Sequence, residues 1–157
     1  MSSNQLMIPD HIGWYISGFC DGEGSFNVSL RRKTDYKIGW QVVLSFNVSQ
    51  RDITMLALIK RYLKCGIIKK RQDGLYSYDV TNPNAITNTI IPFFEKFRFF
   101  SASKKYNFRL FEQITKLVAD KKHLSPEGFQ EIMILREKLN PGRGRTRKYN
   151  IADVLIN

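Results

Sequence analysis

Two carboxylates two residues apart, Asp21 and Glu23, are the side chains whose type and spacing best suit chemistry. They end an apolar stretch with helical spacing, and Gly22 and Gly24 alternate with them. Because the end of a helix carries partial negative charge, carboxylates there are unfavourable unless a cation or a capping group compensates them. Such oxygens suit a hard divalent ion, with Mg²⁺ as the first candidate. The alternative is that Asp21 closes a turn while Glu23 is simply solvated.

A strong excess of positive charge indicates the kind of partner. The 157 residues include 25 Lys and Arg against 14 Asp and Glu, which gives a net charge of +11 and a pI of about 9.8. Such an excess favours a polyanion, most often nucleic acid, over the alternative of a basic protein without such a partner. Carboxylates beside a cationic surface fit nucleic acid if a metal ion lies between them and phosphate.

Composition also narrows the setting of the protein. No segment approaches the roughly 18 apolar residues of a membrane span. The polar N-terminus does not resemble a signal peptide, so we expect neither a membrane partner nor secretion. Cys20 and Cys65 are far apart and are interpreted as reduced thiols. The many Lys, Ile, Asn, Phe and Tyr residues indicate an A·T-rich genome, such as that of a chloroplast or mitochondrion, with a prokaryotic cytoplasm as the alternative.

Periodicity and capping residues predict the elements around the acid pair. Apolar residues recur at helical spacing from Ile12 to Phe19, and polar and apolar residues alternate over 24–33 and 38–50, as in strands. Beyond them we expect a helix capped by Asp52, a hairpin turning at Asp73-Gly74, a short helix over 84–91 and an aromatic connector over 92–100. A longer helix capped by Ser101 or Ser103 and another starting at Ser125 should follow. This order predicts an α+β domain over residues 1–140, with one antiparallel sheet and helices on one face, followed by a basic tail over 141–157 that is mobile at 142–148.

The sheet face without helices is expected to contact nucleic acid. It would display amides, hydroxyls and charged groups at a two-residue step: Asn27, Ser29, Arg31, Lys33, Gln41, Ser45, Asn47, Lys69, Arg71, Ser77 and Asp79. Amides and guanidinium groups can read base edges in the major groove, and cations neutralise phosphate. The aromatic residues fall on the other side of the strands, which favours a duplex over stacked single strands. The alternative is an ordinary wet sheet face.

Small residues along the first helix suggest close packing of helices. Gly13 and Ser17 are four residues apart, and Gly18 follows. The spacing is compatible with two helices whose backbones approach closely, although incidental glycines in a core helix are the alternative. One acid cluster can act on one phosphodiester, so cutting both strands of a duplex suggests a symmetric dimer.

The segment ISGFCDGEG resembles the signature of the LAGLIDADG homing endonucleases. The resemblance extends over roughly residues 10–140 and includes VVLSFNVSQRD, SKKYNFRLFEQI and HLSPEGFQEIMILREKLNPG. It implies an α-β-β-α-β-β-α order, with a curved antiparallel sheet that forms a DNA-binding saddle and helices on the opposite face. Members with one signature act as homodimers, and this chain has one.

The resemblance also implies roles for individual residues. Glu23 would bind the catalytic metal together with the backbone carbonyl of Gly22, and Asp21 would support the turn beside the dimer interface. Gln50 would position solvent at the end of the second strand. Lys104, with Lys105 as the second candidate, would polarise the scissile phosphate. Gly13, Ser17 and Gly18 would pack against the partner's helix.

These observations predict a site-specific double-strand DNA endonuclease that serves intron or intein mobility. The expected cofactor is Mg²⁺, with Mn²⁺ or Ca²⁺ as other possible occupants, and the expected partners are duplex DNA and a second copy of the chain. One rival is a maturase-like protein that binds intron RNA, which would not need Glu23. Another is a basic nucleic-acid scaffold without catalysis.

Overall fold

A four-stranded antiparallel sheet organises the computed structural model, which describes residues 7–141 and 147–155. The strands lie in the order β1-β2-β4-β3. The elements are α1 (Asp10–Glu23), β1 (Gly24–Arg32), β2 (Trp40–Gln50), α2 (Ile53–Leu63), β3 (Ile67–Lys70), β4 (Tyr76–Val80), α3 (Pro83–Ala85), η1 (Ile86–Ile90), α4 (Ile91–Lys96), α5 (Ala102–Ala119), η2 (Lys122–Leu124), α6 (Pro126–Lys138) and α7 (Ile151–Leu155). The predicted α+β class and element order are confirmed.

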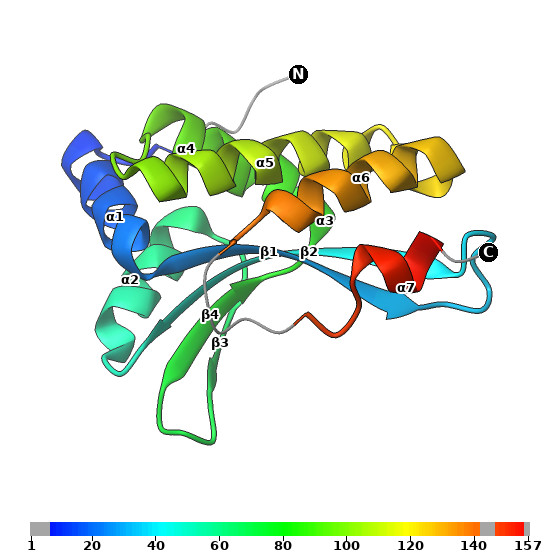
Figure 1. Cartoon of the computed structure of the whole chain (residues 1–157). Coiled ribbons are helices and arrows are strands. Elements are labelled where there is room, and N and C mark those ends of the chain that lie inside the picture. The colour runs from blue at the N-terminus through cyan, green and yellow to red at the C-terminus, as the bar shows by residue number, and fades with distance from the viewer. Residues whose placement is uncertain (1–6, 142–146, 156–157) are drawn as a thin grey trace.

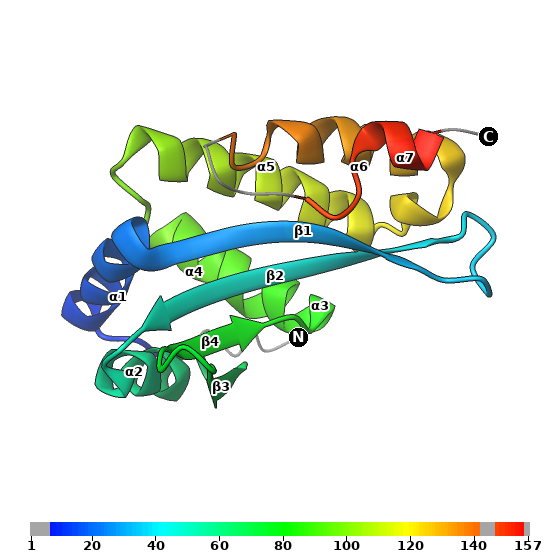
Figure 2. The ribbon, with the colours of Figure 1, turned by 60° about the horizontal axis from the view of Figure 1, so that its bottom comes forward.

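The helices pack on one side of the sheet, and the other side is open. Figure 1 shows α4, α5 and α6 above β1 and β2, while β4 and β3 swing downward, so the sheet is curved. Figure 2 shows α1 and α2 together at the end of the sheet where β1 begins and β2 ends. The curved sheet therefore has one face covered by helices and one face available to a ligand.

Alternation along the strands explains which side is covered. Phe26 pairs with Phe46 and Val28 with Leu44, and all four side chains are buried. The Phe26 ring also lies 5.0 Å, centroid to centroid, from the ring of Phe111 on α5. Side chains at a two-residue step share one face, so the apolar half of each strand packs against the helices and the polar half stays open.

The predicted helix starts are confirmed at three capping residues. Asp52 accepts a hydrogen bond from the Thr54 N–H at 2.8 Å. Ser101 accepts one from the Lys104 N–H, and Ser125 accepts one from the Gly128 N–H. Each side-chain oxygen satisfies a backbone donor that has no partner inside its helix, which fixes where α2, α5 and α6 begin.

The aromatic connector predicted over 92–100 is wrong in its first half. Helical backbone continues through α3, η1 and α4 to Lys96. Pro92 would normally interrupt a helix because it has no N–H to donate. Here the preceding turn is a π-helix, in which the Ile91 N–H bonds to the Ile86 carbonyl, and this wider turn accommodates the proline. Ile90, Phe93 and Phe94 then face the core.

The C-terminal segment folds back onto the domain. Residues 147–155 lie against α6, and Figure 2 shows α7 beside that helix. Residues 142–146, which make up most of the segment expected to be mobile, lie outside the described residues. Within 7–141 and 147–155, no helix has both the length and the apolarity needed to cross a membrane.

The structure contradicts the prediction that Gly13 and Ser17 pack against a partner's helix, because both contact their own chain. A Cβ at Gly13 would lie 2.2 Å from Phe97 Cζ of the same chain. Ser17 is 2% exposed, and its hydroxyl donates to the Phe97 carbonyl at 2.7 Å. The small residues do permit close packing, but their neighbour is Phe97, at the end of α4 in the same chain. Gly18 is exposed, and a Cβ placed there would meet no atom within 4 Å, so its place in an interface stays a prediction.

We expect Gly13→Ala to lower the free energy of unfolding by about 1–3 kcal/mol, because the added methyl overpacks against the buried Phe97 ring. Gly18→Ala is the matched control: it replaces an exposed glycine of the same helix and, in the monomeric chain, should be neutral or stabilising by up to about 1 kcal/mol. Urea unfolding followed by circular dichroism measures both variants. Equal stability of Gly13→Ala and the native chain would contradict the packing described.

Candidate active site and nucleic-acid interface

The junction between α1 and β1 holds the acid pair without an intervening loop. Helix α1 ends at Glu23 and strand β1 begins at Gly24, whose N–H bonds to the Cys20 carbonyl. A Cβ at Gly24 would lie 2.8 Å from that carbonyl oxygen, so only glycine fits this close approach. The chain thus turns sharply from helix to strand and leaves residues 21–23 at the end of the sheet.

Asp21 is used inside the chain. Its Oδ2 accepts hydrogen bonds from the N–H groups of Phe100 and Ser101, both at 3.0 Å, and its Oδ1 accepts from the Ser101 hydroxyl. Burial raises the pKa of Asp21, but the hydrogen bonds from Ser101 and Phe100 and the charge of Lys104 outweigh it, so the pKa falls below its usual value. The carboxylate therefore ties the end of α1 to the start of α5.

Glu23 differs from Asp21 in having no partner. Its side chain is exposed, and it makes no hydrogen bond or ion pair within the described residues. The neighbouring Gly22 is also exposed, and nothing lies within 4 Å of the position of a Cβ there. The exposed Glu23 carboxylate thus lies beside an exposed glycine at the tip of α1.

Lys104, from the first turn of α5, reaches the same junction. Its Nζ donates to the Gly24 carbonyl, whereas the Lys105 side chain is exposed. Burial lowers the pKa of Lys104, and the negative charges of Asp21 and Glu23 oppose this shift. Burial of the Cys20 thiol raises its pKa to about 12, so the thiol stays protonated and inert. The structure therefore brings Lys104 together with the acid pair.

Gln50 lies at the same end of the sheet but is not joined to this group. Gly24 pairs with Val48, which places the end of β2 beside the tip of α1. The Gln50 Oε1 accepts a hydrogen bond from the Arg51 N–H at 2.8 Å. Across the described part of the chain, it makes no hydrogen bond to Glu23 or Lys104. Its role in positioning solvent stays a prediction.

The donors at this junction fit a hard metal ion. Glu23 and Gly22 supply oxygen, and the described residues contain no cluster of three or more His, Cys, Asp or Glu side chains that could hold a metal. Mg²⁺ and Ca²⁺ prefer oxygen donors, and Mg²⁺ commonly keeps several waters while bound through one or two carboxylates and substrate phosphate. One chain alone thus offers a partial site that phosphate oxygens can complete.

A chain of polar contacts crosses the open face of the sheet. The Asn27 amide donates to Asn47 Oδ1 at 2.8 Å, and the Asn47 amide donates to Asp79 Oδ1. Ser77 also donates to Asp79 Oδ1 at 2.8 Å, and Lys69 Nζ lies 3.2 Å from Asp79 Oδ2. This polar chain, Asn27–Asn47–Asp79–Lys69, takes one residue from each of the four strands. Its members hold one another in fixed orientations.

The remaining residues predicted to contact nucleic acid are more loosely held. Ser29, Arg31 and Lys33 are exposed along β1 and the loop after it, while Gln41 and Ser45 are partly buried. Arg71 lies 3.0 Å from Asp73 Oδ2 and 3.4 Å from the Ser49 hydroxyl. Ser77 and Asp79 are only 6% and 8% exposed, so they mainly orient their neighbours. Sequence alternation identified the face, but only the strand register shows which side chains meet.

This chain belongs to the LAGLIDADG endonuclease family, whose model matches residues 16–115. The predicted resemblance is thereby confirmed. Over 145 residues it is 34% identical to the probable intron-encoded endonuclease 2 of Neurospora crassa, covering 90% of this chain but 32% of the relative. It is 28% identical to DNA endonuclease I-CvuI of Chlorella vulgaris, covering 84% and 81% of the two chains. The first of these relatives is thus about three times as long as the matched region.

Solved structures show the same arrangement of elements. The I-SmaMI LAGLIDADG homing endonuclease bound to cleaved DNA superposes with a TM-score of 0.79 at 33% identity, covering 85% of this chain and 45% of that one. Another I-SmaMI structure contains an uncleaved DNA target in the presence of calcium ions. The homing endonuclease I-TnaI gives a TM-score of 0.77 at 29% identity, covering 84% and 89%. The fold of this chain therefore corresponds to nearly all of one relative and to about half of another.

We expect substitutions of Asp21 and of Glu23 to differ in their effects on stability. Asp21→Asn should lower the free energy of unfolding by about 2–3 kcal/mol, because a charged acceptor of three hydrogen bonds is lost. Glu23→Gln, the matched control, should leave it unchanged or raise it slightly, because Glu23 has no partner among the described residues and its charge at the C-terminal end of α1 is unfavourable. Urea unfolding at neutral pH makes the comparison.

Acidification provides a second check on Asp21. The folded-state pKa lies below the usual 3.8, so its contribution to stability is present above that pH and is lost as the pH falls through the folded value. Asp21→Asn should lack this acid-dependent loss. Equal unfolding energies for the Asp21 and Glu23 variants would show that Asp21 does not tie α1 to α5.

Proposed function

We propose that this chain provides one half of a site-specific endonuclease that cuts both strands of duplex DNA, with Mg²⁺ as its cofactor. The observation that carries the proposal is an exposed carboxylate without a partner, Glu23, beside the half-buried cation Lys104 at the edge of an open polar sheet face. The family model, the relatives named as DNA endonucleases and the DNA-bound structures of similar fold support this function.

The open face would bind the duplex through its major groove. Lys69, Arg71, Arg31 and Lys33 supply positive charge for phosphates, and the amides of Asn27, Asn47 and Gln41 can pair with base edges. Because the polar chain fixes Asn27 and Asn47 before binding, their orientation costs little conformational entropy when DNA arrives. The sheet curvature seen in Figure 1 suits a cylindrical partner.

The tip of α1 would act on the phosphodiester. Glu23 and the Gly22 carbonyl would hold the divalent cation, which when bound supplies Lewis acidity at a phosphate. Lys104 lies next to this position and can stabilise the negative charge that develops on the phosphate. Asp21 caps the start of α5 and thereby keeps Lys104 in its place. Gln50, at the same end of the sheet, is our candidate for orienting water.

Cutting both strands requires a second unit of the same fold. The outward face of α1 carries Trp14 and Tyr15, which are 45% and 61% exposed, with Gly18 on the same side. Exposed aromatic residues around a glycine offer area for contact and room for close approach. We propose that this face packs against α1 of a second copy, which would bring two Glu23 side chains together.

The central experiment selects cleavage sites. The native chain is incubated with Mg²⁺ and a randomised duplex library, and the cut products are sequenced. We expect a single long preferred site for the native chain. Glu23→Gln should bind that site with similar affinity but cut it at least about 100-fold more slowly, since several kcal/mol of transition-state stabilisation is lost.

Glu131→Gln is the matched control, because it changes an exposed acid on α6 in the helical layer. It should cut at the native rate. Full cleavage by Glu23→Gln would refute the role of Glu23. Preferential binding of structured RNA, with no cleavage of any DNA, would instead support the maturase-like alternative.

Pairing through α1 has its own test. Gly18→Leu should weaken self-association on DNA by at least about tenfold and reduce double-strand cutting, because the larger side chain separates the helices. Ala57→Leu adds similar bulk to the exposed side of α2 and should have no effect. Sedimentation velocity with and without duplex DNA measures association. A native chain that stays monomeric on its preferred site would overturn the pairing.

A further inference from the structure

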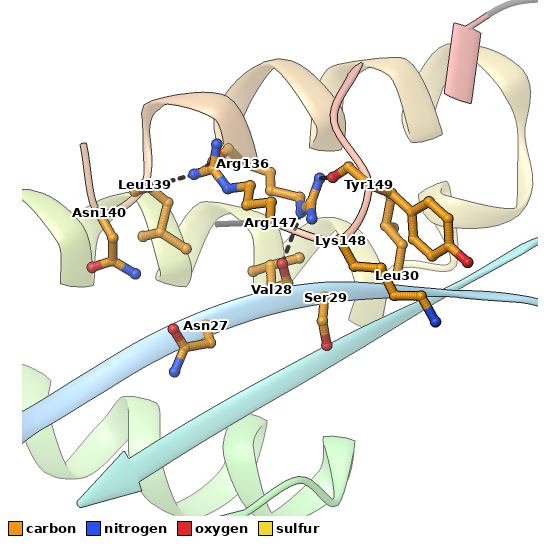
Figure 3. A pocket seen from close by; sticks show the side chains of 10 residues that line it. All are labelled: Asn27, Val28, Ser29, Leu30, Arg136, Leu139, Asn140, Arg147, Lys148 and Tyr149. Carbon is orange, nitrogen blue, oxygen red and sulfur yellow. Dashed lines mark hydrogen bonds between the residues drawn. The ribbon is translucent and has the colours of Figure 1, made fainter. Parts of the chain in front are cut away.

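A buried arginine joins the edge of the sheet to the C-terminal segment. Arg136, in the last turn of α6, is 3% exposed. Its Nε donates to the Val28 carbonyl on β1 and its Nη1 donates to the Tyr149 carbonyl, both at 2.8 Å (Figure 3). A buried charge is costly unless it is well hydrogen-bonded, so these contacts hold the three segments in one arrangement.

Further contacts fix the segment that follows. Arg147 donates to the Arg136 carbonyl at 2.6 Å and lies 3.3 Å from Glu137 Oε2. The Tyr149 ring packs edge-on against Trp40, with centroids 4.8 Å apart. Residues 147–149 therefore run along the outside of β1 in a defined position.

This arrangement places Lys148 at the rim of the open face. Figure 3 shows its amine beside β1, on the side of that strand where the side chains of Asn27 and Ser29 lie. All three residues line the same cavity of about 160 Å³ between β1, the end of α6 and the C-terminal segment. Lys148 is exposed, so its charge continues the polar surface of β1 outward.

Lys148 also differs from its neighbour Arg147, which has an acidic partner. Glu137 pairs with Arg147, and Arg136 is buried against carbonyls. Among the residues that the structure describes, no carboxylate lies within 4 Å of the Lys148 amine, which lies 5.4 Å from the centroid of the Tyr149 ring. Together with Arg32, whose guanidinium lies 5.9 Å from the centroid of the Tyr149 ring, these cations outnumber Glu137 and leave a local excess of positive charge that an anion would balance.

We propose that Lys148 contacts a backbone phosphate of the nucleic acid that lies on the open face, and that the C-terminal segment is thus a fixed part of the binding surface. This inference rests on the proposed function. A phosphate is the expected group because Lys148 lies outside the edge strand, where a flexible point charge reaches the backbone rather than the bases. A strand added to this edge is a poor rival, since Arg136 and Asn140 already occupy the Val28 and Phe26 carbonyls.

The salt dependence of binding tests the contact. Affinity for a long duplex of arbitrary sequence is measured over a range of salt concentrations in buffer with EDTA, which prevents cleavage. Lys148→Ala should reduce the slope of log K against log salt by about 0.9, the value for one phosphate contact. Lys116→Ala removes an exposed lysine from α5 in the helical layer and should keep the native slope.

Amine footprinting of the native chain gives an independent reading without any substitution. Lysines are acetylated with and without duplex DNA and quantified by mass spectrometry. Lys148 should be protected several-fold by DNA, and Lys116 should not. Equal slopes for the two variants, or equal acetylation of Lys148 in both conditions, would overturn the inference while leaving the proposed function intact. Failure of the native chain to bind duplex DNA at all would overturn both.

Discussion

The carboxylate of Asp21 is the interaction on which the arrangement of the site depends. It accepts three hydrogen bonds from Phe100 and Ser101, about eighty residues away in the sequence. One group thus closes the end of α1 and the start of α5 at the same point. Because Lys104 follows within the first turn of α5, its amine meets the Gly24 carbonyl next to Glu23. Asp21 thus helps to hold Lys104 beside Glu23 and the start of β1.

The two acids of the signature therefore have different physical roles. Asp21 is satisfied within the chain, and its low pKa reflects those partners. Glu23 is left exposed at a helix end, where a negative group is unfavourable until a cation arrives. A cation bound there would relieve an unfavourable charge that is already present in the free protein. The stability gained at Asp21 makes the unsatisfied position of Glu23 tolerable.

Much of the fold followed from local rules in the sequence, and the failures have identifiable causes. Alternation in β1 and β2 and the caps Asp52, Ser101 and Ser125 depend on neighbouring residues, so they could be predicted. The residue that packs against Gly13 and Ser17 could not be predicted, since small residues at this spacing permit close packing against any neighbour. In the structure this neighbour is Phe97. The helix through Pro92 depends on a π-turn, for which the sequence contains no recognisable pattern.

The site could also be predicted only in part. Residue types suggested Glu23, Lys104 and the open face, but that Glu23 and Lys104 lie at one junction could be seen only in the tertiary structure. The contact between Arg136 and Tyr149 was not suspected, because a charged residue in an amphipathic helix is normally expected at its surface.

The polar chain from Asn27 to Lys69 has a consequence for changing the DNA sequence that this face is proposed to bind. Each member is oriented by the next, so replacing Asn47 alone would remove one partner from Asn27 and one from Asp79, while Asp79 would keep Ser77 and Lys69. Substitutions at linked positions do not add independently. Efforts to change what the sheet face binds should therefore redesign these four strand positions together.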